Sequence, residues 1–451
     1  MTGDTPLGRR GHGTRPGHGE PPAGAAPSKE TARSTGEPDV PLESRAGTGT
    51  PRTGTGALGS GRGATTSGAQ TTDSRPEPSD GDAADSLLTV RGLTVTLRRA
   101  GREIRLVDGI DLDVRPGEVL GIAGESGSGK TVTGMTLVGL GPDRAEVTGS
   151  VRFDGRELVG LPERKWEAIR GREIAVVFQD PSAALHPMLT VGRQITDHVR
   201  RHRGLPRKQA AARALELLDL VRIPGGTSAA ERYPHQFSGG MRQRIAIASA
   251  LACGPRLLIA DEPTTALDVT VQAGIVELLD ELRRETGMAI AMVTHDLGVL
   301  SSVADRIAVF YSGRVVETGT VAEVIGSPRH PYTRGLLQAL PHASLGQRSA
   351  VGHAVPLRPI PGSAPAADAL PPGCPFHPRC AVAIDGCDRV RPVPVVIGPA
   401  RTVACALAGP GVSGAADAGP EPVRDRSVGT EPVDDRATDD RATDDHARSD
   451  A

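Results

Sequence analysis

The sequence has no run of about 20 consecutive apolar residues, the length that a helix needs to cross the hydrocarbon core of a bilayer. We therefore expect that the chain does not span a membrane itself. Near the N-terminus, Arg9 and Arg10 are not followed by an apolar run, so we expect no secretory signal and a cytoplasmic protein.

An excess of positive charge is also missing. The 451 residues include 52 Lys and Arg against 54 Asp and Glu, which gives a formal net charge of −2. Without an overall basic field, the composition gives no support to nucleic-acid binding. Cysteine is scarce, with five in the chain, and in a cytoplasmic protein these are expected to be thiols or metal ligands rather than disulfides.

Large apolar side chains are rare at both ends of the chain. Residues 1–85 contain only Met1, Leu7, Val40, Leu42 and Leu58 and no aromatic residue. The other end is rich in Gly, Pro and Asp and finishes in a repeated Asp-Asp-Arg-Ala-Thr unit. Such segments cannot bury enough surface to offset the entropy of ordering them. We predict disordered tails at 1–85 and 407–451 and a folded part near 87–405.

One stretch organises the folded part. Residues 124–131, Gly-Glu-Ser-Gly-Ser-Gly-Lys-Thr, fit the phosphate-loop pattern and lie between an apolar run at 119–123 and a helix-compatible run at 132–140. A strand, a glycine-rich turn and a helix point several backbone N–H groups at one place, where the positive helix end also lies. This predicts a nucleoside triphosphate site. The expected phosphate-binding residues are Gly124, Ser126, Gly127, Ser128, Gly129 and Lys130, with the Thr131 hydroxyl on Mg²⁺.

Strand and helix patterns surround this loop. Residues 88–97 and 104–114 before it, and 149–155 after it, predict an antiparallel sheet, which kinases and small GTPases do not have. Helical spacing at 191–201 and 207–221 predicts a helical subdomain inserted into the main sheet.

Polar residues follow three buried strand-like runs. Gln179 follows 174–178, Asp261 and Glu262 follow 257–260, and His295 follows 289–293. The carboxyl ends of such strands border the ligand crevice of an open α/β sheet. We expect Asp261 to hold Mg²⁺, Gln179 to ligate Mg²⁺ or position water, Glu262 to accept a proton from the attacking water, and His295 to contact the γ-phosphate.

A second anion site is predicted at Ser238, Gly239 and Gly240, where a serine caps the start of a helix. One helix start cannot share a single γ-phosphate with a phosphate loop far from it. We therefore expect these three residues to serve a triphosphate bound by another subunit.

Four of the five cysteines, Cys374, Cys380, Cys387 and Cys405, lie in a Pro-rich stretch with few core residues. Clustered thiolates in a reducing compartment favour zinc or an iron–sulfur cluster. The gaps of 5, 6 and 17 residues lack the paired Cys-x-x-Cys of most zinc ribbons, and four uncoordinated thiols remain the alternative. Cys253 stands alone on a predicted helix and is expected in the core.

As a set, these motifs resemble the ATP-binding subunits of ABC transporters over about residues 87–340. The resemblance implies an α/β fold with a RecA-like core, an antiparallel β subdomain and a helical subdomain at about 180–255. It implies two domains that clamp two ATP molecules head to tail, and it adds Asp268 to the nucleotide-binding residues. Two departures stand out: Leu97 occupies the expected place of an adenine-stacking aromatic, and Phe237 and Met241 replace the commoner Leu and Gln of the signature.

Four segments, 178–181, 261–268, 330–337 and 373–380, are similar to the oligopeptide/dipeptide/nickel importer ATPases. This implies an ATPase domain at 86–340, a C-terminal extension at 341–406, and a peripheral location on the cytoplasmic face of the membrane. The implied partners are a second ABC ATPase subunit, commonly a different chain, two integral-membrane permeases and, indirectly, a solute-binding protein. The resemblance favours a structural 4Fe–4S cluster over Zn²⁺ at the four cysteines.

Oligopeptides or dipeptides are the expected solute, and nickel or another small solute is the alternative. A further alternative is a soluble ABC ATPase that acts on nucleic acid or ribosomes. Such proteins generally carry two cassettes or a long coiled-coil insert, and this sequence has neither. A redox module built on the cysteines would leave the phosphate machinery without a use.

Overall fold

The computed structural model of the chain describes residues 85–99, 101–265, 267–340 and 357–408. The predicted disordered tails, 1–85 and 407–451, lie outside these ranges except for their innermost residues. Across the part that is described, no helix combines the length and the apolar character needed to cross a bilayer.

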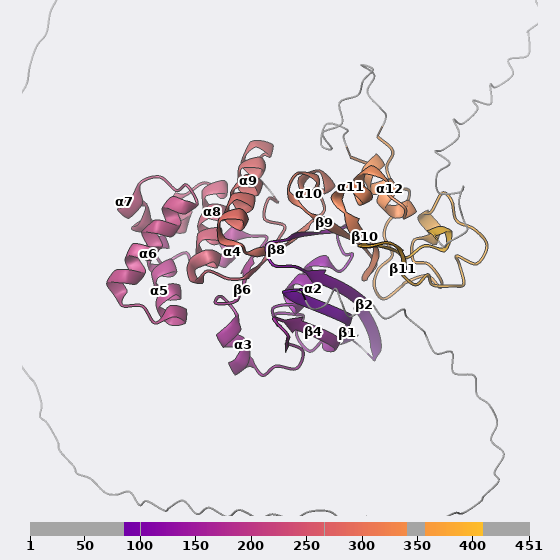
Figure 1. The fold of residues 1–451 in the computed structure, drawn as a ribbon, viewed down its shortest axis with the longest axis horizontal. Coiled ribbons are helices and arrows are strands. Elements are labelled where there is room, and N and C mark those ends of the chain that lie inside the picture. Colours follow the sequence, from indigo (N-terminus) through magenta and orange to yellow (C-terminus); the bar gives the residue numbers. More distant parts are fainter. Residues whose placement is uncertain (1–84, 100, 266, 341–356, 409–451) are drawn as a thin grey trace, which may run out of the picture. The chain divides into compact units, whose positions relative to one another are not determined.

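An eight-stranded sheet forms the centre of the fold, in the order β11-β12-β10-β9-β3-β8-β7-β6 (Figure 1). Its five parallel strands are β6 (Ile174–Val177), β7 (Leu257–Asp261), β8 (Ala289–Thr294), β3 (Val119–Ala123) and β9 (Arg306–Tyr311). The remaining three run antiparallel to their neighbours: β10 (Arg314–Thr320), β12 (Arg401–Val403) and β11 (Val395–Gly398).

The parallel strands are buried on both faces, which explains their continuous apolar sequences. In β3, Val119 and Ala123 belong to one hydrophobic core, whereas Leu120 and Ile122 belong to the other. The same alternation holds in β7, where Leu257 and Ile259 face the second core. Because side chains alternate along a strand, Asp261 points to that same face, toward the helix that follows the phosphate loop.

A four-stranded antiparallel sheet covers this second core, in the order β2-β1-β4-β5. Its strands are β1 (Leu88–Arg99), β2 (Arg102–Val114), β4 (Glu146–Phe153) and β5 (Arg156–Glu157). Helices α2 (Lys130–Thr136) and α3 (Glu163–Ile169) lie on the same side of the large sheet (Figure 1). The predicted antiparallel sheet is confirmed, and its first strands are slightly longer than the sequence patterns indicated.

The predicted helical subdomain is also present. Helices α5, α6, α7 and α8 contact one another and group beyond β6 in Figure 1. Their apolar faces are buried, with Ile195 and Val199 of α5 and Leu217 and Leu218 of α6 inaccessible to solvent. The bounds are α4 (Pro181–Ala184), α5 (Val191–Arg203), α6 (Arg207–Leu220), α7 (Gly226–Ala230) and α8 (Gly239–Ala250).

After α8, the described part of the chain has four more α-helices. They are α9 (Val269–Thr286), α10 (Leu297–Val303), α11 (Val321–Gly326) and α12 (Pro331–Gln338). Helices α9 and α10 pack on the first core, through side chains such as Leu278, Leu282 and Leu300.

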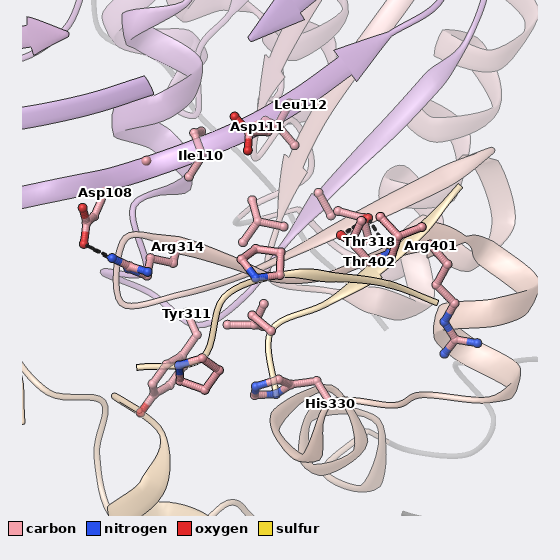
Figure 2. A pocket seen from close by; sticks show the side chains of 18 of the residues that line it. Asp108, Ile110, Asp111, Leu112, Tyr311, Arg314, Thr318, His330, Arg401 and Thr402 are labelled. Atoms are coloured by element: carbon pink, nitrogen blue, oxygen red, sulfur yellow. Dashed lines mark hydrogen bonds and ion pairs between the residues drawn. The ribbon is translucent and has the colours of Figure 1, made fainter. Parts of the chain in front are cut away.

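Residues 357–408, here called the C-terminal segment, attach to the edge of the large sheet. Strand β12 pairs with β10, and the hydroxyls of Thr318 and Thr402 lie 2.7 Å apart (Figure 2). Next to them, Arg401 donates to the fully buried Glu317 carboxylate over 2.9 Å. A cavity of about 320 Å³ lies between this segment and strands β2, β9 and β10.

Candidate active site

The phosphate loop joins β3 to α2 and requires glycine at two positions. Gly124 and Gly129 have φ angles of +146° and +100°, which residues with a side chain rarely adopt. A Cβ at Gly124 would overlap the carbonyl oxygen of Phe310, and one at Gly129 would lie 2.9 Å from the carbonyl oxygen of Leu106. These two residues therefore let the loop curl tightly against its neighbours.

Lys130 lies inside this loop and is only 4% exposed. Its Nζ donates to the carbonyl oxygens of Gly124, over 2.8 Å, and Glu125, over 2.9 Å. Burial lowers the pKa of Lys130, and the carboxylates of Glu262, Asp261 and Glu125 oppose that shift. Beside it, the buried Ser128 Oγ has no hydrogen-bond partner. A buried ammonium and a free hydroxyl under a glycine-rich loop suit a phosphate group.

Thr131 and Asp261 form a pair at the start of α2. The Thr131 hydroxyl donates to Asp261 Oδ1 over 3.0 Å, and Asp261 is 3% exposed. Burial raises the pKa of Asp261, while the Thr131 hydrogen bond and the Lys130 charge act in the opposite direction. Hydroxyl and carboxylate oxygens are ligands that Mg²⁺ prefers, so these two residues fit a magnesium ion.

Glu262 is held from several sides. Its Oε2 accepts hydrogen bonds from Gln179 Nε2, at 3.0 Å, and from the Thr265 hydroxyl, at 2.8 Å. His295 Nδ1 lies 3.5 Å from Oε1. The sequence predicted that Gln179, Glu262 and His295 would meet. It did not predict Thr265, for which no sequence pattern gave a signal.

A cavity of about 700 Å³ unites these groups. Gln179, Glu262 and His295 line it together with most of the phosphate loop. Leu106 of β2 also lines it, whereas Leu97, our expected adenine position, does not. Unexpectedly, Leu336 of α12 and two residues of the C-terminal segment, Pro365 and Ala367, complete the wall.

Two known families match this chain. The ABC transporter family matches residues 107–265, which include the phosphate loop and the Asp261–Glu262 pair. The C-terminal region of the oligopeptide/dipeptide transporter family matches residues 316–387, which span β10, α12 and much of the C-terminal segment.

Curated relatives extend the match to most of the folded chain. The oligopeptide transport ATP-binding protein of Salmonella typhimurium is 44% identical over 322 residues, 71% of this chain and 94% of the relative. The dipeptide transport ATP-binding protein of Bacillus subtilis is 44% identical over 325 residues, which are 72% of this chain and 95% of the relative. A putative peptide import ATP-binding protein of Brucella abortus is 48% identical over 308 residues, which are 68% of this chain and 91% of the relative.

The chain belongs to the oligopeptide/dipeptide ABC transporter ATP-binding proteins. It therefore has the ABC ATPase cassette fold and is an ATPase by family. The expected RecA-like core, antiparallel sheet and helical subdomain correspond to the elements described above.

The remaining nucleotide-binding candidates of this ABC protein lie apart from the cavity. Ser238, Gly239, Gly240 and Asp268 do not line it. Ser238 is exposed and accepts from the Met241 N–H at 3.4 Å to cap α8, and Asp268 accepts from the Val271 N–H at 3.0 Å to cap α9. Within one chain Ser238 and Asp268 cap helices and Gly239 and Gly240 begin α8, so the predicted contact of these residues with nucleotide is not made in the cavity of their own chain.

The cysteines of this ABC protein give the metal prediction no support. All five are free, and the described parts of the chain contain no group of three or more His, Cys, Asp or Glu side chains that could hold a metal ion. Burial raises the pKa of the Cys374 and Cys380 thiols, and that of Cys405 to about 11. Cys253 is buried, as predicted.

Proposed function

We propose that this protein binds and hydrolyses ATP to power the import of oligopeptides or dipeptides through an ABC transporter. The observation that carries the proposal is the Glu262 carboxylate, held by Gln179 and Thr265 in the cavity that the phosphate loop lines. Membership of the oligopeptide/dipeptide family supports peptides, rather than nickel or nucleic acid, as the transported or bound partner.

In this proposal the loop residues hold the triphosphate. Lys130 moves its ammonium from the carbonyl oxygens of Gly124 and Glu125 to the phosphates, and the Ser128 hydroxyl finds a partner there. Thr131, Asp261 and Gln179 would hold Mg²⁺, which when bound neutralises charge on the β- and γ-phosphates.

Glu262 acts as the general base. It takes a proton from water as the water oxygen bonds to the γ-phosphorus, and the bond from that phosphorus to the β–γ bridging oxygen breaks, which releases ADP and phosphate. Gln179 and Thr265 fix the orientation of the carboxylate, and His295 contributes from the other side.

A second ATPase subunit, commonly a different chain in this family, completes each site. Ser238, Gly239, Gly240 and Asp268 of one subunit would contact the nucleotide of the other. ATP closes this dimer and hydrolysis reopens it. The motion passes near Gln179 to two integral-membrane permeases that hold the protein at the cytoplasmic face of the membrane, with a solute-binding protein acting indirectly.

The domain limits are part of this proposal: an ATPase domain at 86–340 and a peptide-importer extension at 341–406. For the extension we propose a structural 4Fe–4S cluster held by Cys374, Cys380, Cys387 and Cys405, with Zn²⁺ as the alternative. The proposal rests on the sequence alone, in which these four cysteines lie between residues 374 and 405. Anaerobic purification followed by iron, sulfide and zinc analysis tests it: one zinc and no sulfide per chain overturns the cluster, and no metal at all overturns both.

The Glu262→Gln variant tests the catalytic proposal in the complex with its permeases. It should bind ATP normally and lose roughly two to three orders of magnitude in peptide-stimulated ATP turnover, as expected for a missing base. Glu277→Gln, which removes an exposed carboxylate from α9, is the matched control and should hydrolyse ATP at the wild-type rate. Near-normal turnover by Glu262→Gln would exclude Glu262 as the base. Stimulation by RNA but not by peptide would overturn the transport role.

A further inference from the structure

An ion pair connects the phosphate loop to the C-terminal segment. Arg379 Nη1 lies 2.7 Å from Glu125 Oε2, and Nη2 lies 2.9 Å from Oε1, so the contact is bidentate. The two residues are 254 positions apart in the chain. Two parallel charge-assisted hydrogen bonds of this kind are strong and geometrically specific.

The guanidinium of Arg379 is rigidly held and 7% exposed. Its Nε donates to the carbonyl oxygen of Pro361 over 2.9 Å, and Nη1 lies 3.4 Å from the Tyr311 hydroxyl. The rings of Tyr311 and Phe376 lie within 6.0 Å of its central carbon. The hydrogen bonds that Arg379 donates to Glu125 raise the pKa of Arg379, so the guanidinium stays charged.

Glu125 is restrained through its backbone as well. Its N–H donates to the hydroxyl of the buried Tyr332 in α12 over 2.9 Å, and its carbonyl accepts from Lys130. Tyr332 packs against Tyr311, which borders the cavity shown in Figure 2, and against Phe376. The region after β10 therefore controls both the backbone and the charge of one phosphate-loop residue.

Charge makes this contact matter for nucleotide binding. Glu125 lines the proposed ATP cavity and acts electrostatically on Lys130, so an unpaired carboxylate at this position would repel a triphosphate. Arg379 removes that repulsion without occupying the cavity, because it does not line it.

We propose that Arg379 is a positioning residue of the ATP site, which neutralises Glu125 and fixes the phosphate loop from the C-terminal segment. ATP affinity in this protein then depends on that segment being docked. The inference rests on the proposed nucleotide site, and a failure of ATP to bind the wild-type chain at all would be a failure of that site rather than of Arg379.

The test measures ATP binding by calorimetry in full-length chains that carry Glu262→Gln to block hydrolysis. Arg379→Gln should weaken ATP binding about tenfold, as for one unbalanced charge near a ligand. Adding Glu125→Gln to that variant should restore the affinity to within about twofold of the wild type, and Arg379→Lys should lose less than Arg379→Gln. A merely structural role for Arg379 predicts no recovery in the double variant.

Arg391→Gln is the matched control. Arg391 belongs to the same segment and lies 3.0 Å from Asp108, which keeps its contact with Arg314 and is not in the phosphate loop. This variant should bind ATP normally. Wild-type affinity in Arg379→Gln, or no recovery in the double variant, overturns the proposal.

A second variant tests the proposal if Arg379→Gln does not fold. If Arg379→Gln is unfolded by circular dichroism, Glu125→Gln alone decides. With Arg379 still present, loss of the carboxylate should leave ATP binding equal or tighter, because positive charge then predominates beside the phosphates. Weaker binding in Glu125→Gln would overturn the proposal.

Discussion

Glu262 adopts a backbone conformation that residues with a side chain rarely occupy, with a φ of +45°. Such conformations cost of order 1–3 kcal/mol and persist where the surroundings enforce them. Here the Glu262 N–H donates to the carbonyl oxygen of Val293 over 2.8 Å, while Gln179 and Thr265 hold the carboxylate. The fold therefore holds Glu262 in an unfavourable backbone conformation that directs its side chain into the cavity.

A Gln179→Glu variant tests how Glu262 is held. A carboxylate would replace the amide whose Nε2 donates to Glu262 Oε2 over 3.0 Å, so the hydrogen bond would be lost and two like charges would face each other. ATP turnover by the purified complex should therefore fall by about tenfold or more. Wild-type turnover in this variant would show that Gln179 does not orient Glu262.

The sequence was sufficient to predict which polar residues meet at the strand ends, and insufficient for contacts between distant segments. Gln179, Glu262 and His295 could be predicted because parallel strands bring their carboxyl ends to one edge. Arg379 could not be, since no local pattern reports a partner 254 residues away. The family pattern put Leu97 at the place of an adenine-stacking aromatic, whereas Leu106 of β2 lines the cavity and Leu97 does not.

At the scale of elements, helix α12 begins with an uncharged cap. His330 is fully buried, and its Nδ1 accepts from the Tyr332 N–H over 3.1 Å. Burial lowers the pKa of His330 to about 4, against a backbone hydrogen bond with Ala404 that raises it. The buried Glu317 carboxylate accepts the His330 backbone N–H over 3.0 Å and is itself paired with Arg401.

This buried histidine should make stability depend on pH. Its pKa is about 6.5 in the unfolded chain and about 4 in the folded one, so between these values only the unfolded chain takes up the proton. His330 therefore does not lower the free energy of unfolding above pH 6.5. It lowers this free energy progressively as the pH falls from 6.5 toward 4. Between pH 7.5 and 4.5 the wild type should lose about 2–3 kcal/mol more unfolding free energy than His330→Asn.

Urea denaturation of both proteins at the two pH values measures that difference. Asparagine retains a side-chain oxygen that can cap α12 and does not titrate, so the other histidines cancel in the comparison. Equal losses in the two proteins would mean that His330 is not the responsible group.

Strands with continuous apolar sequences were predicted well, and the partly exposed strands near the end of the chain were not. The buried runs that became β3, β6, β7 and β8 could be recognised because both faces of these strands enter a core. Strands β11 and β12, of four and three residues, are only partly buried and therefore have no continuous apolar run. Their place in the large sheet comes from pairing with β10, which only the folded chain reveals.

At the scale of the whole molecule, the site is divided between two chains in our proposal. Ser238→Asp tests this, because aspartate still caps α8 but places a negative charge where the γ-phosphate of the second subunit would bind. In the Glu262→Gln background, this variant should keep ATP binding as an isolated chain and lose ATP-dependent dimerisation with the second ATPase.

Light scattering after size-exclusion chromatography gives the readout. Ser302→Asp, an exposed position on α10, is the matched control and should dimerise like its parent. Dimerisation that survives Ser238→Asp would contradict the head-to-tail arrangement.

The motifs were sufficient to predict that the protein is an ATPase subunit of an ABC transporter. They could not identify which contacts join the C-terminal segment to the ATPase domain.

The pairing of Glu125 with Arg379 also imposes an order during synthesis. A ribosome that has completed residue 125 must add 254 more before the counter-charge exists. At about 5–20 residues per second, this takes on the order of ten to fifty seconds. Until then a nascent cassette carries an unbalanced carboxylate in its phosphate loop and, in our proposal, binds ATP about tenfold more weakly than the finished chain.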